Sequence, residues 1–289
     1  MRIFSVFIFT ILAAASSSAL AQPVPAAIYT DPPADAAHPA KMTVLHIPSH
    51  GLLINGLVYS PPGAGLHPTI VICHGLPGNE KNLDLAQALR RAGWNAVAFN
   101  YRGSWGSPGK FRFAQTLEDA NAVLAYLRDP ANARTLGIDT KRIAIAGHSM
   151  GGWVTAHTAA SDHALIGAIL ISAGDMGADG DAPRERIVAE MADNMESLAG
   201  VTAESMADEV QANAKAFHME NAAAGLRQLP LLAITSDDGL APQTDALVGS
   251  IQSKGGHNVT TLHVATDHSY SDRRILLESV IIKWLNELH

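Results

Sequence analysis

The stretch RIAIAGHSMGGW, residues 142–153, decides the fold of this protein. Its first half is an alternating apolar run that stops at Gly147, as a buried strand would. Its second half places Ser149 in the pattern G-x-S-x-G, and a helical pattern follows. In this arrangement a strand turns sharply into a helix, and the turn presents the serine hydroxyl at the carboxyl end of the strand. The stretch therefore predicts an activated serine at the edge of a sheet.

Strand and helix patterns alternate on both sides of this stretch. Strands are expected at 42–48, 52–62, 69–75, 95–101, 142–148, 167–174, 231–236 and 259–266, and helices at about 81–92, 117–128, after Ser149 and 273–288. The run TIVICHG at 69–75 is apolar almost throughout, which indicates a strand buried on both faces. The alternation predicts an α/β fold with a mostly parallel central sheet flanked by helices.

One segment, about residues 175–229, interrupts this alternation. It contains no convincing strand pattern and is rich in Ala, Glu and Met. We interpret it as a small helical cap inserted into the domain. Its methionines, Met191, Met195, Met206 and Met219, fit an apolar acyl pocket or the packed interior of the cap equally well.

The N-terminal stretch has the features of a secretory signal peptide. Arg2 precedes an apolar run, and Ala19-Leu20-Ala21 fits the small-x-small pattern for cleavage before Gln22. The apolar run is shorter than the roughly 20 residues that a membrane-spanning helix needs. We therefore expect a periplasmic or secreted protein with no integral membrane segment after cleavage.

This interpretation divides the chain into three parts. Residues 1–21 form the signal peptide, and residues 22–41 form an extended leader rich in proline and alanine. Residues 42–289 suit one α/β domain that includes the cap insertion.

Composition excludes several classes of function. The formal net charge is −7 and the chain has no Lys/Arg cluster, so a nucleic-acid partner is not expected. Cys73 is the only cysteine, so no intrachain disulfide can form. The chain has neither CxxC nor HExxH, and we expect no metal and no cofactor. The sequence carries no signal of its oligomeric state.

A nucleophilic serine needs a base, and the base needs a carboxylate that orients it. Both are expected at the ends of later strands, in the order Ser, acid, His. The strand 231–236 leads into Asp237 and Asp238, and the strand 259–266 leads into His268. We predict that His268 is the base and that one of the two aspartates is the acid, with Asp175 as an outside candidate.

Other histidines are weaker candidates for the base. His257 falls in a turn and His263 in the middle of a strand. His218 falls in the cap, where we expect it to be exposed. His148 adjoins the serine, but neighbours in a turn point apart, so we expect it to support the turn.

The tetrahedral intermediate of acyl transfer also needs backbone N–H donors. One should come from Met150, directly after the nucleophile, and the other from the loop HGLPG at 74–78. Within that loop we choose Leu76, because Pro77 has no N–H.

These motifs carry a resemblance to a known family. CHGLPGNEKN, NYRGSWGSPG, GHSMGG, TSDDGLAP and TDHSYSD resemble those of serine hydrolases of the α/β-hydrolase fold, across about residues 42–289. The likeness is greatest to the dienelactone-hydrolase-like and prolyl-oligopeptidase-like branch. It implies Ser149 as nucleophile, His268 as base and Asp238 as acid. Asp238 stands four residues before Pro242, as in related loops.

The chain also departs from both types of relative. It has no room for the large domain that usually precedes a prolyl-type peptidase, and His74 stands where many of those peptidases have a tyrosine. Dienelactone hydrolases proper use a cysteine nucleophile, which is absent here. In the loop RGSWGSPG, Arg102 and Ser104 either border the substrate or tie the loop down, and we prefer the second. Trp105 and Trp153 are interpreted as packing residues.

The leading hypothesis is hydrolysis of a small-molecule carboxylic ester, or a related acyl bond, through an acyl-enzyme. The same triad could cleave amides or small peptides instead. A third hypothesis, from another class, is a non-catalytic binding protein on a hydrolase fold. A cofactor-free haloperoxidase-like activity is a further, minor option.

Overall fold

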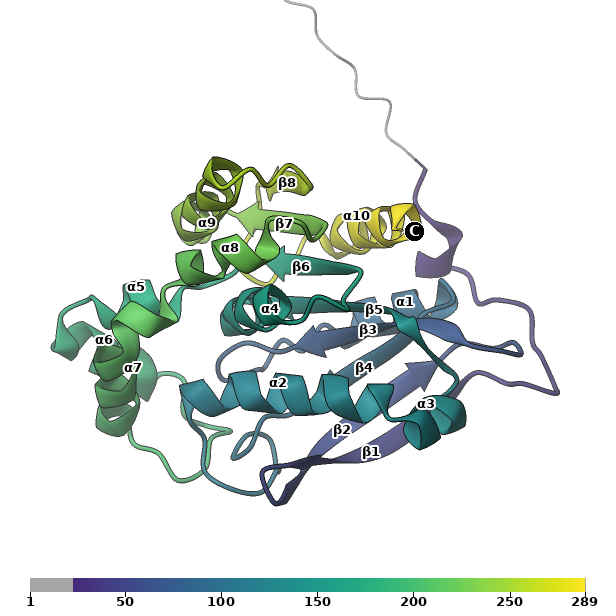
Figure 1. Cartoon of the computed structure of the whole chain (residues 1–289), viewed down its shortest axis with the longest axis horizontal. Coiled ribbons are helices and arrows are strands. Elements are labelled where there is room, and N and C mark those ends of the chain that lie inside the picture. Colours follow the sequence, from purple (N-terminus) through teal and green to yellow (C-terminus); the bar gives the residue numbers. More distant parts are fainter. Residues whose placement is uncertain (1–22, 289) are drawn as a thin grey trace, which may run out of the picture.

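The protein is described by a computed structural model, and the structure describes residues 23–288. An eight-stranded sheet forms its centre, in the order β1-β2-β4-β3-β5-β6-β7-β8 (Figure 1). The strands are β1 (Lys41–Ser49), β2 (Leu52–Ser60), β3 (His67–Cys73), β4 (Asn95–Phe99), β5 (Ile138–His148), β6 (Gly167–Ile171), β7 (Leu231–Ser236) and β8 (Val259–Val264). β1 and β2 pair antiparallel to each other, β2 pairs antiparallel to β4, and the remaining pairs are parallel. The predicted fold class is confirmed.

Helices cover both faces of the sheet (Figure 1). One face carries α1 (Leu83–Arg91) and α10 (Arg274–Glu287), whose apolar residues pack on Ile70, Ala144 and Ile169. The other face carries α2 (Phe113–Arg128), α4 (Met150–Ser161) and α9 (Ala241–Ser253). Because both faces are covered, the inner strands are almost wholly buried, which is why they appear in the sequence as continuous apolar runs.

The segment 175–229 is entirely helical apart from its connections. It forms α5 (Met176–Gly180), α6 (Arg184–Ala192), α7 (Ala203–Phe217), the 3-10 helix η2 (Met219–Ala222) and α8 (Ala223–Leu226). α5 begins just after β6 ends, so this segment starts at the carboxyl edge of the parallel strands. Figure 1 shows α5, α6 and α7 gathered beyond that end of the sheet. We call residues 175–229 the cap from here on.

Three helical details differ from the sequence expectation. α2 begins at Phe113, four residues before the predicted start at Leu117. The helices α3 (Pro130–Leu136) and α9 were not predicted. Asp129 caps α3 by accepting hydrogen bonds from Ala131 and Asn132, and Gly137 ends it with φ 67°. A helix of seven residues is too short to show apolar periodicity, so only its capping residues could have revealed it.

The structure describes most of the predicted leader and none of the predicted signal peptide. Most of the predicted leader is irregular, with a short 3-10 helix η1 (Ala26–Ile28) bound by the Arg91 side chain. The predicted signal peptide, residues 1–21, lies outside the described residues. Within residues 23–288, no helix has the length and apolar character needed to cross a membrane.

Candidate active site

Ser149 sits at the turn between β5 and α4, in a backbone conformation that L-residues rarely adopt. Its φ is 58° and its ψ is −127°. The flanking glycines are obligatory: a Cβ on Gly147 would lie 1.9 Å from the Gly151 carbonyl oxygen, and one on Gly151 would lie 2.1 Å from the Cys73 carbonyl oxygen. The G-x-S-x-G pattern is therefore explained by backbone-to-backbone packing around a strained serine.

The loop after β3 packs directly against this turn. Cys73 is in register with Gly147 across the parallel β3–β5 pair. A Cβ built on Gly75 would lie 2.8 Å from the Cβ of Ser149, so only glycine lets the two backbones approach this closely. The sequence-predicted loop at 74–78 is thus brought alongside the serine.

The two predicted aspartates have different partners. Asp238 Oδ2 lies 2.7 Å from His268 Nδ1, and the Asp238 side chain is only 5% exposed. Asp237 Oδ1 lies 2.9 Å from Nε2 of His263 on β8, and its side chain is 63% exposed. A carboxylate can only accept, so His268 Nδ1 must carry the proton and His268 Nε2 is left as the free acceptor.

The Asp238 carboxyl is held in its ionised form. Burial by itself raises the pKa of Asp238, but hydrogen bonds from His268, from the Leu240 N–H and from nearby Ser172 and Ser236 lower that pKa below its usual value. The ionised acid suits the task of stabilising a charged imidazole.

A hydroxyl network beside Asp238 was missed by the sequence analysis. Ser172 Oγ lies 2.8 Å from Ser236 Oγ and 3.0 Å from the Tyr270 hydroxyl, and all three residues are buried. Ser172 follows β6, Ser236 ends β7, and Tyr270 comes two residues after His268. Their position at strand ends, next to the predicted acid and base, is the signal that could have identified them.

His148 supports the site and is unsuited to be the base. Its Nε2 lies 2.8 Å from the His268 carbonyl oxygen, and the two imidazole rings are 4.5 Å apart between centroids. Burial, with a contribution from His268, lowers the pKa of His148 to about 4, so it is neutral at physiological pH. His148 therefore joins the serine turn to the His268 loop, as a hydrogen-bond donor.

Ser149 and His268 reach the same edge of the sheet without a direct hydrogen bond between their side chains. Across residues 23–288 the structure has no hydrogen bond from the Ser149 hydroxyl to the His268 imidazole. Such contacts are often long in the absence of substrate and shorten when it binds.

The two predicted oxyanion donors are backbone groups of Leu76 and Met150. Met150 is the first residue of α4, so its N–H has no acceptor within the helix. Among the described residues, neither this N–H nor that of Leu76 has a hydrogen-bond acceptor outside regular helices and strands. Both are available to an oxygen atom of a ligand.

His74 holds the peptide plane that carries the Leu76 N–H. Its Nδ1 lies 2.8 Å from the Gly75 carbonyl oxygen, which belongs to the same peptide unit as that N–H. Burial lowers the pKa of His74 to about 4, so its imidazole stays neutral. The Tyr101 hydroxyl donates to the His74 carbonyl at 3.1 Å and steadies the other side of the loop.

The loop RGSWGSPG has a structural role at Arg102. The Arg102 guanidinium is 8% exposed and pairs with Asp119 at 2.6 Å and with Glu118. Ser104 is fully buried. The preferred interpretation, that Arg102 ties this loop down, is confirmed.

The two tryptophans differ from each other. Trp153 is fully buried on α4, and its Nε1 donates to the Phe217 carbonyl at 2.6 Å, so it packs as expected. Trp105 is 37% exposed, and its Nε1 donates to the Pro77 carbonyl at 2.6 Å. The expectation that Trp105 is a packing residue was wrong, because more than a third of the residue is exposed and its indole N–H makes a polar contact.

The remaining candidates lie elsewhere. His218 was expected to be exposed, but it is half-buried between Asp181 at 2.9 Å and Asp175 at 3.6 Å. Asp175 caps α5, and its carboxylate lies beside His218. His257 is exposed in its turn. Met191, Met206 and Met219 are buried in the main core, and Met195 packs against it. No group of three or more potential ligand side chains within 23–288 is placed to hold a metal.

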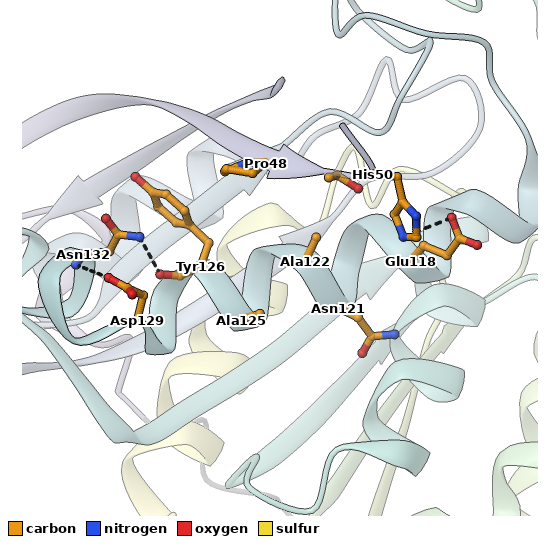
Figure 2. Close-up of a pocket in the computed structure, with 10 residues that line it drawn as sticks. Pro48, His50, Glu118, Asn121, Ala122, Ala125, Tyr126, Asp129 and Asn132 are labelled. Atoms are coloured by element: carbon orange, nitrogen blue, oxygen red, sulfur yellow. Dashed lines mark hydrogen bonds and ion pairs between the residues drawn. The ribbon is translucent and has the colours of Figure 1, made fainter. Parts of the chain in front are cut away.

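A cavity of about 680 Å³ lies away from these groups, between the end of β1 and α2 (Figure 2). Ala122 and Ala125 are among the residues that line it, and His50 and Glu118 lie 3.4 Å apart at one end. None of the triad candidates lines it.

Comparison with known proteins agrees with the observed fold. The family model described as "Alpha/beta hydrolase family" matches residues 70–275. An uncharacterized protein of Mycobacterium tuberculosis (strain ATCC 25618 / H37Rv) is 29% identical over 124 residues, or 43% of this chain and 42% of that protein. The match thus spans less than half the length of this relative.

Solved structures share the fold at low sequence identity. Acylaminoacyl peptidase of Pyrococcus horikoshii has a TM-score of 0.67 at 18% identity, covering 86% of this chain and 42% of that one. A thermostable carboxylesterase cloned from a metagenomic library has a TM-score of 0.66 at 20% identity, covering 91% and 92%. At such identities the likeness shows the fold alone.

Proposed function

Because the chain belongs to the alpha/beta hydrolase family, we propose that it is a serine hydrolase that cleaves a carboxylic ester or related acyl bond. The observation that carries the proposal is the 2.7 Å contact between His268 and the shielded Asp238, beside the strained turn of Ser149. Strain at a buried, over-determined turn is typical of a functional residue.

In the proposed mechanism, Ser149 Oγ attacks the carbonyl carbon of the substrate while His268 Nε2 accepts its proton. Asp238 keeps the proton on Nδ1 and stabilises the imidazolium that forms. The N–H groups of Leu76 and Met150 donate to the oxyanion. The intermediate collapses, and the imidazolium returns its proton to the leaving group. Water, activated by His268, then hydrolyses the acyl-enzyme.

The neighbouring aspartates provide a matched test of the mechanism. Asp238→Asn should lower kcat roughly 10⁴-fold, because asparagine favours the wrong imidazole tautomer. Asp237→Asn changes the same chemical group one residue away and should leave kcat within about twofold of the wild type, since Asp237 contacts His263. Equal effects of the two substitutions would contradict the assigned acid.

The serine itself is tested by covalent labelling with a fluorophosphonate. The wild type should be labelled, and Ser149→Ala should be neither labelled nor active on short-chain aryl esters. An unlabelled wild type would support the alternative of a non-catalytic binding protein. Both substrate types are tested because one structural neighbour is an acylaminoacyl peptidase and another a carboxylesterase. Peptide amides cleaved far faster than esters would favour the peptidase alternative.

A further inference from the structure

The carbonyl of Pro77 is the meeting point of three segments that are distant in the sequence. Trp105 Nε1, from the loop after β4, donates to this oxygen at 2.6 Å. Ser197 Oγ, from the cap between α6 and α7, donates to the same oxygen at 3.1 Å. Pro77 directly follows Leu76, the proposed oxyanion donor, so both contacts act on the loop that aims this donor.

The two donors reach Pro77 as one unit, because backbone hydrogen bonds join their segments. The Trp105 N–H donates to the Ser197 carbonyl at 3.0 Å, and the Ala199 N–H donates to the Gly103 carbonyl at 2.7 Å. The Phe111 N–H donates to the Ala199 carbonyl at 2.9 Å and extends this ladder. An isolated antiparallel bridge joins Ser104 to Leu198. The cap is therefore fastened to the 103–111 loop at the point where both touch Pro77.

A further, solvent-exposed contact links the cap to the loop 75–79. Asn79 Nδ2 donates to Glu196 Oε1 at 2.8 Å, two residues beyond Pro77. The loop 75–79 thus has its Gly75 carbonyl held by His74 and its Pro77 carbonyl held by Trp105 and Ser197. Leu76 lies between these two anchors.

We infer that Trp105 and Ser197 are positioning residues, which orient the Leu76 N–H through the Pro77 carbonyl and so couple docking of the cap to the oxyanion hole. The inference rests on the proposed serine hydrolase function. A misplacement of about 1 Å in the catalytic geometry can cost roughly 10²-fold in rate, and loss of one oxyanion donor costs about 10²–10³-fold. The coupling therefore acts on the transition state and leaves ground-state binding of the substrate unchanged.

Two variants remove the contacts. Trp105→Phe keeps an aromatic ring near the Lys81 ammonium, which lies 4.0 Å from the indole centroid, but it loses the N–H donor together with one of the two fused rings. Ser197→Ala loses the hydroxyl. Trp94→Phe is the matched control, because Trp94 packs at the opposite, amino-terminal end of β4. Ser253→Ala controls for the loss of a surface hydroxyl.

Each test variant should lower kcat about 10-fold with KM within twofold, and the double variant about 100-fold, the loss typical of one oxyanion donor. Affinity for an aryl trifluoromethyl ketone, which forms a tetrahedral adduct, should fall by the same factors. Amide hydrogen exchange in residues 75–80 should become faster in the test variants and stay unchanged in both controls.

Wild-type kcat and unchanged exchange in the double variant would overturn the inference, and so would a rise in KM at constant kcat, which would indicate direct substrate contact. These outcomes are distinguishable from failure of the proposed function. If fluorophosphonate does not label the wild type, the hydrolase proposal fails and the catalytic role of Trp105 and Ser197 fails with it. If the wild type is labelled and the variants behave as the wild type, the inference alone fails.

Discussion

At the scale of the residue, Ser149, the proposed nucleophile, has a strained backbone conformation. Its φ of 58° and ψ of −127° are held by three backbone hydrogen bonds: its N–H donates to Ile171, and its carbonyl accepts from Gly152 and Gly174. Strain of this kind costs of order 1–3 kcal/mol and persists only where the surroundings enforce it. The site is thus maintained at the expense of stability.

Replacing Ser149 should release this strain in a way that depends on the Cβ atom. Ser149→Gly removes the Cβ and should be about 1 kcal/mol more stable than Ser149→Ala, after allowing for the greater backbone entropy of unfolded glycine. Urea unfolding of the two inactive variants measures the difference. A Ser149→Gly protein less stable than Ser149→Ala by about 0.5–1 kcal/mol, the ordinary entropic cost of glycine, would show that the turn carries no strain.

The choice between Asp237 and Asp238 also belongs to the residue scale. Both follow the same strand, and residue type alone could not separate them without the family resemblance. Their side chains leave the end of β7 in different directions, so one pairs with His263 on the edge strand and the other with His268. That difference depends on the path of the backbone after Ser236.

At the scale of the element, the short helix α5 carries a carboxyl group in an unfavourable environment. Burial raises the pKa of Asp179 to about 7, and the charges of Glu190 and Asp175 add to the effect, while Arg186 opposes it. The pKa in the folded state therefore lies above the ordinary value of 3.8. Stability is fully present below that ordinary value and is lost as the pH rises through about 7.

Asp179→Asn should stabilise the protein increasingly as the pH rises from 5 to 8. At pH 8 the gain should be about 1–2 kcal/mol, discounted for partial solvent screening of the group. Urea unfolding across this range measures the gain, with Asp193→Asn as control because Asp193 is exposed at the end of α6. A gain independent of pH would contradict this account of Asp179.

The cap illustrates how far an element can be predicted. Its helical character was clear from composition and from the lack of a strand pattern between residues 175 and 229. Its docking was not, because the contacts of Ser197 with Pro77 and of Trp153 with Phe217 join residues far apart in the chain. The apolar periodicity of a helix identifies its buried face but not the surface that covers it.

At the scale of the whole molecule, two buried histidines make the fold sensitive to acid. The pKa values of His74 and His148 are each lowered by burial to about 4, below the ordinary 6.5. Between pH 4 and pH 6.5 the unfolded chain therefore binds more protons than the folded chain. Because of this, stability that is present above pH 6.5 is lost as the pH falls toward 4. A shift of this size corresponds to a loss on the order of 3 kcal/mol per histidine.

We expect the free energy of unfolding to fall steeply between pH 7 and pH 4.5, and His148→Gln to flatten this decline by on the order of 2 kcal/mol. Glutamine keeps an N–H donor for the His268 carbonyl and does not titrate. His257→Gln, at an exposed position, is the control. A decline as steep in His148→Gln as in the wild type would exclude this histidine as a source of acid sensitivity.

The sequence by itself determined the α/β class, the helical cap and the residue types at the strand ends. These properties are local, since a strand buried on both faces must be apolar and a sharp strand-to-helix turn needs glycines. Only the tertiary structure decided the strand order, the pairing of His268 with Asp238, the hydroxyl network of Ser172 and the junction at Pro77. Each of these joins side chains or strands that are distant along the chain, and no periodicity in the sequence encodes which distant neighbours meet.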